Sequence, residues 1–262
     1  MMRRSDMIAN YHTHTPRCGH AVGSEREYIE RAIEGGIEIL GFSDHAPYRF
    51  DRPGRYPGVR MEPEMLPDYA ETFFAMRNEY AGKIELHLGV EAEYYPRYFS
   101  SLVDDLRANG VEYMILGQHF FGDEIGEPGT MAATTDPADL DRYVSQVIEG
   151  METGLFSYIA HPDVLRFEGE VAEYYRGYRR LCVRARELGI PLEINLLGMR
   201  NGRHYPNERF WRIAGEEGNT VILGSDAHRP EDTWIPETEL AALALVDKFS
   251  LHLIDKLELR RI

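Results

Sequence analysis

Imidazole and carboxylate side chains, which bind divalent transition metals, recur in this chain at the ends of short apolar runs. The runs are MIANYHTH, IEILGFSDH, KIELHLGVEAE, EYMILGQH, FSYIAHPD and TVILGSDAH. They supply the candidate ligands His12, His14, His45, Glu91, His119, His161, Asp226 and His228. The ends of several strands meet in one place when the strands run parallel in a barrel, where such folds keep their chemistry. The sequence therefore predicts one polynuclear metal site, with a hydrolase as the leading functional class.

Two of the runs end in a pair of ligand-type residues two positions apart. His12 and His14 share one face of an extended strand, because side chains alternate along it, so both can reach one ion. Asp226 and His228 repeat this arrangement in the last run. Glu91 can bridge two ions, since a carboxylate has two oxygens. These spacings favour more than one ion in the same site.

Single histidines complete the candidate set. His45, His119 and His161 each offer one nitrogen, and His20 lies in the loop after the first strand. Nine ligands are too many for one ion, so we expect two or three divalent ions. Nitrogen and carboxylate ligands without thiolate suit zinc, manganese or iron. A close pair of such ions can activate water for in-line attack on phosphorus.

A lone histidine or acid at a strand end is more often a surface or hydrogen-bonded residue than a ligand. Asp44 and Asp163 fit that alternative as turn caps, or as partners that orient an imidazole. The joint pattern favours a metal site, because seven of the ten histidines fall at or just after strand ends. We interpret His87 and His252 as structural, whereas His204 lies near the expected mouth and could contact substrate.

Short apolar segments alternate with helical patterns along the chain. The expected strands cover residues 7–13, 37–43, 84–91, 113–118, 157–160, 191–196 and 220–224. Their continuous apolar character is typical of strands covered on both faces, and the alternation with helices indicates a parallel sheet. Seven strand–helix units with every ligand at a strand end favour an α/β barrel, with residues 1–262 as one domain.

Local signals mark helix ends and two long loops. Ser24 opens a capping-box pattern, and Asp136 followed by proline predicts a helix start. Residues 171–188 show the clearest helical period and end at a glycine. Residues 46–63, rich in proline and arginine, and residues 121–136 each follow a ligand-bearing strand end. We expect both loops to overhang the mouth and help define the substrate.

The composition excludes several classes of partner. The 262-residue chain carries a net charge of −15, so duplex nucleic acid and anionic membranes are poor partners, while a cationic small substrate suits it. The longest apolar run, residues 240–246, is far shorter than the ~20 residues of a membrane span. Cys18 and Cys182 make no disulfide framework, and the N-terminus lacks the apolar stretch of a signal peptide. We therefore expect a reduced, cytoplasmic setting.

In their order along the chain, HTHT..CGHA, FSDHAP, GVEAE, LGQHF, AHPD and LGSDAH resemble the motifs of the PHP (polymerase and histidinol phosphatase) family. The resemblance covers about residues 8–230, and the HTHT..CGHA and EINLLGMR segments look most like the histidinol-phosphate phosphatase branch. It implies a distorted seven-stranded, TIM-like (β/α)7 barrel with up to three metals. The ligand sets implied for the three ions are His12, His14, Glu91 and Asp226; Glu91, His119 and His161; and His20, His45 and His228.

The resemblance also selects residues around the metals. Either Glu91 or Glu93 could reach inward from the third strand, and the family match selects Glu91. Arg200 resembles the phosphate-binding arginine of the branch, and Arg166 is a weaker match. A guanidinium binds a phosphate monoester bidentately, although a solvated loop arginine is the alternative for Arg200. The pattern leaves open whether Asp226, a histidine such as His228, or a metal-bound water protonates the leaving group.

The leading prediction is a metal-dependent phosphomonoesterase that hydrolyses L-histidinol phosphate in histidine biosynthesis. A second reading is the same chemistry on another small phosphate ester, such as a nucleotide or sugar phosphate. Many members of the branch read GSVH where this chain has Gln118 before His119, which keeps this alternative open. A third reading is a non-catalytic PHP domain, against which the intact ligand set argues. The sequence leaves the native metal and the oligomeric state open.

Overall fold

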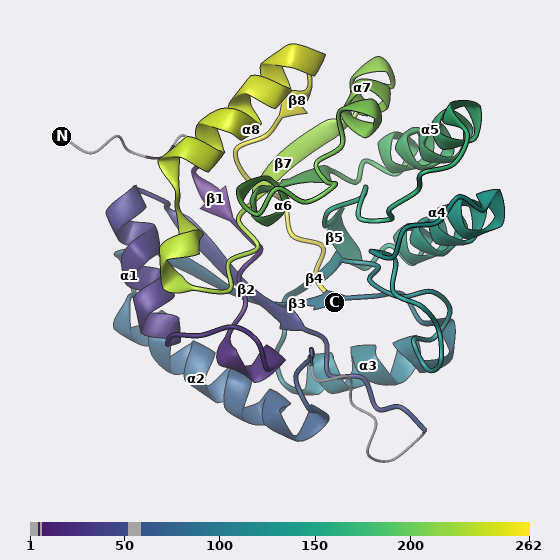
Figure 1. Cartoon of the computed structure of the whole chain (residues 1–262). Helices are drawn as coiled ribbons and strands as arrows, with labels where there is room; N and C mark the ends of the chain where they lie inside the picture. Colours follow the sequence, from purple (N-terminus) through teal and green to yellow (C-terminus); the bar gives the residue numbers. More distant parts are fainter. Residues whose placement is uncertain (1–4, 6, 52–58) are drawn as a thin grey trace.

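The computed structural model describes residues 5, 7–51 and 59–262, and these residues form one parallel eight-stranded sheet in sequence order. Each strand pairs with the next one along the chain, which gives the curled sheet surrounded by helices in Figure 1. The strands are β1 Ala9–Asn10, β2 Ile39–His45, β3 Glu85–Ala92, β4 Tyr113–Leu116, β5 Phe156–Ile159, β6 Leu192–Asn195, β7 Thr220–Gly224 and β8 His252–Leu253. The parallel α/β, TIM-like architecture is therefore as predicted.

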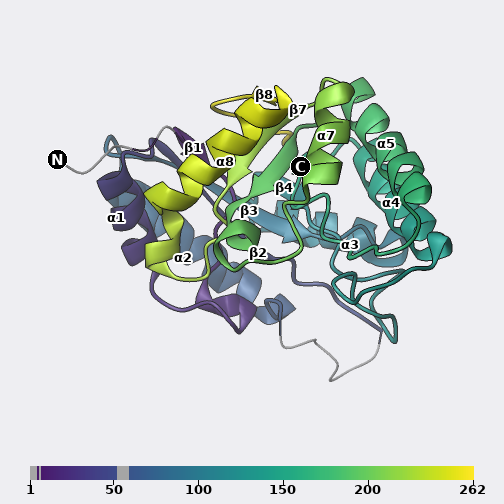
Figure 2. The same ribbon diagram turned by 45° about the horizontal axis from the view of Figure 1, so that its top comes forward.

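Except for the short α6, the helices lie on the outer side of the sheet, as the two views in Figures 1 and 2 show. They are α1 Glu25–Gly35, α2 Leu66–Glu79, α3 Pro96–Ala108, α4 Pro137–Glu152, α5 Val171–Glu187, α6 Leu196–Arg200, α7 Glu208–Glu216 and α8 Pro236–Phe249, with short 3-10 turns at Pro16–Cys18, Pro63–Met65 and Pro230–Thr233. The Ser24 capping box, the Asp136 cap and the end of α5 before Gly189 are confirmed. No helix among the described residues is long and apolar enough to cross a membrane.

The expected count of seven strands is wrong, because β8 adds an eighth. This two-residue strand pairs with the start of β7, and two residues are too short to show any periodic pattern. At the opposite end, the segments after β1 and β7 meet in a parallel bridge between Thr13 and Ala227. The backbone N–H of His14 donates to the Ala227 carbonyl at 2.9 Å. The bridge brings the first and last ligand-bearing segments together. The expectation that residues 1–262 form one domain stays a prediction.

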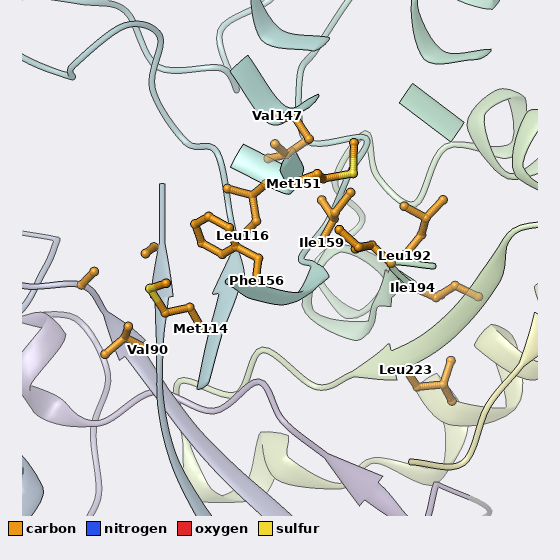
Figure 3. Packing of buried hydrophobic residues seen from close by; sticks show 14 of the residues in the cluster. Val90, Met114, Leu116, Val147, Met151, Phe156, Ile159, Leu192, Ile194 and Leu223 are labelled. Atoms are coloured by element: carbon orange, nitrogen blue, oxygen red, sulfur yellow. The ribbon is translucent and has the colours of Figure 1, made fainter. Parts of the chain in front are cut away.

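Outward-facing strand residues pack against the helices. Figure 3 shows this layer between the strands and α4, where Val147 and Met151 lie against Leu116 and Phe156. All four side chains are buried. Apolar side chains of this size each stabilise the fold by about 1.5–3 kcal/mol when fully buried. This layer fixes the strands whose opposite ends carry the candidate ligands.

A second, smaller cluster fills the inside of the curled sheet. Tyr113 points inward and donates to the Tyr11 carbonyl at 2.8 Å. Gly41 and Gly89 leave room for its side chain, since a Cβ at Gly41 would lie 2.1 Å from the Tyr113 hydroxyl oxygen and one at Gly89 would lie 2.3 Å from the ring. The segment after β8 crosses beneath this cluster, where the backbone N–H of Leu257 donates to the Tyr11 hydroxyl at 3.3 Å. The end of the sheet opposite the ligands is thus covered.

Candidate active site

A cavity of about 610 Å³ opens where the candidate ligands gather at the carboxyl ends of the strands. Its lining includes the predicted ligands His20, His45, Glu91, His119, His161, Asp226 and His228. His12 and His14 lie fully buried directly behind it. A larger groove of about 770 Å³ runs between α4 and α5, but mostly paired arginines and glutamates line it, and none of the candidate ligands does. The structure therefore brings all nine predicted side chains together around one cavity.

Glu91 lies at the centre of the cluster. Its two oxygens approach ring nitrogens of five histidines: His161 at 2.8 Å, His45 at 3.1 Å, His12 at 3.3 Å, His119 at 3.4 Å and His14 at 3.5 Å. Gly117, just beyond β4, makes this position possible, because a Cβ there would lie 1.9 Å from Oε1 of Glu91. A carboxylate with histidine nitrogens around both oxygens is arranged as a bridging ligand would be.

Asp226 is the second acidic centre. Its Oδ1 lies 3.2 Å from Nε2 of His14 and 3.4 Å from Nδ1 of His228. The residue adopts a positive φ of 48°, and His161 also has a positive φ, of 30°. Such conformations are uncommon for residues other than glycine and concentrate at functional sites. Both strained residues here are candidate ligands.

The third group of histidines forms a stack at the cavity edge. The rings of His20 and His228 are stacked with centroids 4.6 Å apart, and His45 lies 5.4 Å from His20. Cys18 is buried nearby, close enough to make a possible ligand set with His20 and His228. Burial, followed by the charge of Asp44, raises the pKa of this thiol to about 12. Cys18 therefore stays protonated, in keeping with a site of imidazoles and carboxylates.

Several ligand-type atoms are buried without a hydrogen-bond partner among the described residues. They are Nε2 of His12, Nε2 of His14, Nε2 of His228 and Oε2 of Glu91. Buried polar atoms nearly always have a partner, and both Nε2 of His12 and Nε2 of His14 lie within 3.5 Å of Oε2 of Glu91, so this group needs an explanation. A divalent cation would supply it, because imidazole nitrogen and carboxylate oxygen are its preferred ligands. The residues present therefore fit divalent metal binding.

The charges of the site also suit a cation. Burial opposes ionisation of Glu91 and Asp226, but the neighbouring imidazoles outweigh it and hold the pKa of both carboxyls well below their usual range. Burial, reinforced by His14, lowers the pKa of His45 well below its usual value and that of His228 to about 3. Carboxylates beside His14 outweigh burial there and raise its pKa to about 9. A cation would meet ionised carboxylates and the neutral imidazoles of His45 and His228, and would displace the proton from His14.

Comparison with known families decides the assignment, since the profile of the PHP domain matches residues 10–196. This chain belongs to the PHP domain family. A relative from Deinococcus radiodurans named "Probable histidinol-phosphatase" is 32% identical over 232 residues, covering 85% of this chain and 87% of that protein. The "Histidinol-phosphatase" of Bacillus subtilis is 25% identical over 256 residues, covering 84% and 93%.

A solved structure has the same fold as this PHP domain. It is a histidinol phosphate phosphatase from Lactococcus lactis, complexed with zinc, L-histidinol and phosphate, and it superposes with a TM-score of 0.74. The two chains are 18% identical, and the match covers 96% of this chain and 99% of the other. At this identity the likeness shows the fold, so ligand and substrate roles must be argued from the residues of this chain.

The predicted substrate contacts differ in their placement. Arg200, at the end of α6, lines the cavity and pairs with Asp232 at 3.3 Å. Arg166 is half-exposed and pairs with Glu168, and His204 lies 2.7 Å from the Val164 carbonyl. Within the described part of the chain, neither Arg166 nor His204 lines the cavity. Substrate binding by these two residues finds no support in the geometry and stays a prediction.

Both predicted loops contribute to the cavity. Val59 and Met131 come from the two loops and line its mouth, although each side chain is more than 40% exposed. Residues 52–58 of the first loop lie outside the described residues. Gln118, where the chain departs from its branch, instead bonds the backbone of Tyr94 and Phe120. Gln118 is therefore not part of the described lining, but it holds the backbone of Phe120, which is.

Three buried polar residues near the ligands, Arg60, Glu193 and Asn195, were not singled out by the sequence patterns. Glu193 and Asn195 end β6 beneath the site, and Arg60 pairs with Glu93 at 3.1 Å. Glu93 in turn lies 3.0 Å from Nδ1 of His119. The one sequence signal for these residues is the polar Glu and Asn of the EIN segment at a strand end. Which residues they bond in the buried network depends on the fold, so the sequence does not reveal it.

Proposed function

We propose that this PHP protein is a metal-dependent phosphomonoesterase that hydrolyses L-histidinol phosphate to L-histidinol and phosphate in histidine biosynthesis. The observation that carries the proposal is the convergence of nine ligand-type side chains and Arg200 on one cavity. The names of the relatives from Deinococcus radiodurans and Bacillus subtilis support the substrate. The alternative is the same reaction on another small phosphate ester, such as a nucleotide or sugar phosphate. A cytoplasmic location stays a prediction.

The proposed cofactor is two or three zinc, manganese or iron ions. The proposed ligand sets are His12, His14, Glu91 and Asp226; Glu91, His119 and His161; and His20, His45 and His228, which agree with the contacts around Glu91 and Asp226. When bound, such ions polarise phosphoryl oxygens and make water a stronger nucleophile. The protein's own part is to hold the carboxylates ionised and the imidazoles in fixed directions.

Arg200 is the proposed phosphate-binding residue. Asp232 lies 3.3 Å from its Nη2, and Nη1 donates to the Ser225 carbonyl at 3.4 Å, so the guanidinium is held at the cavity wall. Asp226 and His228 are the other proposed catalytic residues. Their lowered pKa values leave both without a proton near neutral pH, so each presents a free lone pair to a metal ion and neither holds a proton for the leaving group.

The substrate's organic part is proposed to lie at the cavity mouth. Val59, Phe120, Met131 and Tyr205 make this part of the lining largely apolar and aromatic. A flat imidazole fits such a wall, and the net charge of −15 favours a substrate that carries a positive amine. These features support histidinol phosphate over a bulkier, more anionic nucleotide.

The test is a panel of initial rates with defined metals. Protein purified without chelator should hold at least two metal equivalents, and histidinol phosphate should have the highest kcat/KM among nucleotide, sugar and tyrosine phosphates. If another ester exceeds it tenfold, about 1.4 kcal/mol of transition-state preference, the substrate is wrong while the phosphatase class stands. Full activity in excess chelator, with no bound metal, would contradict the class itself.

Arg200→Lys should lower kcat/KM by one to two orders of magnitude without changing metal content. The loss corresponds to roughly 1.5–3 kcal/mol for a charged hydrogen bond, because an ammonium cannot reproduce the planar fork of guanidinium. Arg166→Lys is the matched control, since Arg166 pairs at the surface with Glu168. No loss in Arg200→Lys would make Arg200 an ordinary loop arginine, whereas an equally large loss in Arg166→Lys would assign substrate binding to both residues.

A further inference from the structure

We propose that Glu193, together with Asn195, is a positioning residue that fixes three proposed metal ligands from three other strand ends. The three ligands are His12, His161 and Asp226. Glu193 is fully buried at the end of β6 and is not itself in a proposed ligand set. The inference rests on the proposed metal site but not on which phosphate ester the site takes.

The carboxylate of Glu193 accepts from donors on both sides. Oε1 lies 2.7 Å from Nδ1 of His12 and 3.4 Å from the Tyr158 hydroxyl. Oε2 accepts from the backbone N–H of His161 and from Nδ2 of Asn195, each at 3.0 Å. All four of these partners act as donors to the carboxylate. Glu193 thus ties β1, β5 and β6 together directly beneath the site.

Each contact determines the direction of a ligand. With Nδ1 of His12 bonded to Glu193, Nε2 is the ring nitrogen left to face the site, where it lies 3.3 Å from Glu91 and 3.6 Å from Asp226. The backbone of His161, strained at a φ of 30°, is held by its N–H bond to the same carboxylate. Removing the carboxylate would therefore release one imidazole and one backbone segment at the same time.

Asn195 extends the network to the third ligand. Its Oδ1 accepts from the backbone N–H of Gly198 at 2.9 Å and so caps α6, which fixes the orientation of the amide. Nδ2 then faces the two carboxylates and donates to Glu193 and, at 3.1 Å, to Asp226. Because α6 ends in Arg200, the same residue also connects the metal ligands to the helix that carries the proposed phosphate-binding arginine.

The neighbouring strand leaves a space for this carboxylate. A Cβ at Gly224 in β7 would lie 1.8 Å from Oε1 of Glu193. A buried carboxylate is costly unless each oxygen is well bonded, and four donors satisfy that condition here. The fold thus holds the buried Glu193 carboxylate at a place where two of its four donors belong to the proposed ligands His12 and His161.

Glu193→Gln is the sharpest test, because the shape is nearly kept while one oxygen becomes a donor. Whichever way the amide turns, its NH₂ faces two other donors, so either His12 or the His161–Asn195 pair loses its acceptor. We expect a 10- to 100-fold weaker affinity for zinc or manganese, the range typical of residues that orient metal ligands. The affinity is measured on metal-free protein by competition with a chromophoric chelator.

Two companion variants separate positioning from folding. Asn195→Ser keeps a good helix cap for α6 but removes both amide donations, so it should weaken metal affinity several-fold at unchanged thermal midpoint. Tyr158→Phe removes only the 3.4 Å contact and should bind metal as the unchanged protein does. Excess manganese should restore turnover in Glu193→Gln, which a merely destabilised protein would not show.

Wild-type metal affinity in both Glu193→Gln and Asn195→Ser would overturn the inference. The inference would also be overturned if Asn195→Ser bound metal weakly and excess metal did not restore binding, because the defect would then lie in the fold. A wrong substrate assignment would be seen in the rate panel and would leave these affinities unchanged. The two failures are therefore distinguishable.

Discussion

Glu91→Gln should abolish nearly all turnover and remove at least one metal ion while the protein stays folded. The glutamine is almost the same shape, but it lacks the charge and offers only one good acceptor to the five histidines around it. Metal ions contribute several kcal/mol to stabilising phosphoryl transition states, so we expect a loss on the order of a thousandfold or more, about 4 kcal/mol. Metal analysis, circular dichroism and steady-state kinetics on the same preparation measure it.

Two substitutions of the same kind on β3 and just beyond it serve as controls. Glu85→Gln, at the far end of the strand, removes an exposed carboxylate bonded to His87 and should leave metal content and rate unchanged. Glu93→Gln should have an intermediate effect, because Glu93 contacts Arg60 and His119. If Glu91→Gln kept its metal and Glu93→Gln lost it, the roles assigned to Glu91 and Glu93 would be reversed.

Gly117→Ala should reproduce most of the metal loss of Glu91→Gln although it substitutes none of the proposed ligands. A methyl group at this position would lie 1.9 Å from Oε1 of Glu91, so the carboxylate must leave its place between the histidines. We expect metal affinity to fall by about two orders of magnitude or more, the upper end of what disturbed ligand orientation produces. Isothermal titration of metal-free protein with manganese measures the change.

Gly129→Ala is the control for metal affinity. Its added methyl group would make only ordinary contact, with the nearest atom 3.6 Å away, so binding of the metal should not change. If Gly117→Ala bound metal as tightly as the unchanged protein, Glu91 would have another usable orientation. The bridging role proposed for its carboxylate would then need revision.

The sequence predicted the parts of the site that depend on strand ends. Parallel strands deliver their carboxyl ends to one place, so His12 and Asp226 could be grouped with an acid of the third strand, and the family resemblance selected Glu91 as that acid. The sequence could not reveal β8, because two residues carry no period. Spacing alone did not separate Arg200 from Arg166. The family resemblance ranked Arg200 first, and the fold places Arg200, but not Arg166, in the described lining of the cavity.

Buried partners were the least predictable feature. Glu193 and Arg60 are read from sequence as ordinary polar residues, and their burial depends on which strands and loops surround them. Donor–acceptor matching around a buried carboxylate is a three-dimensional property that spacing does not encode. The local helix signals, such as the Ser24 capping box, were predictable because they involve residues only three positions apart.

Glu91 and Glu193 share an arrangement that should be visible across related sequences. Each carboxylate leans over the neighbouring strand segment at a glycine, Gly117 for the first and Gly224 for the second. If either glycine is replaced by a residue with a side chain, the paired position, 91 or 193, must carry a shorter acid or a residue that is not acidic. Among homologues the two positions of each pair should therefore vary together, and a lineage that lost one glycine should have replaced the matching glutamate.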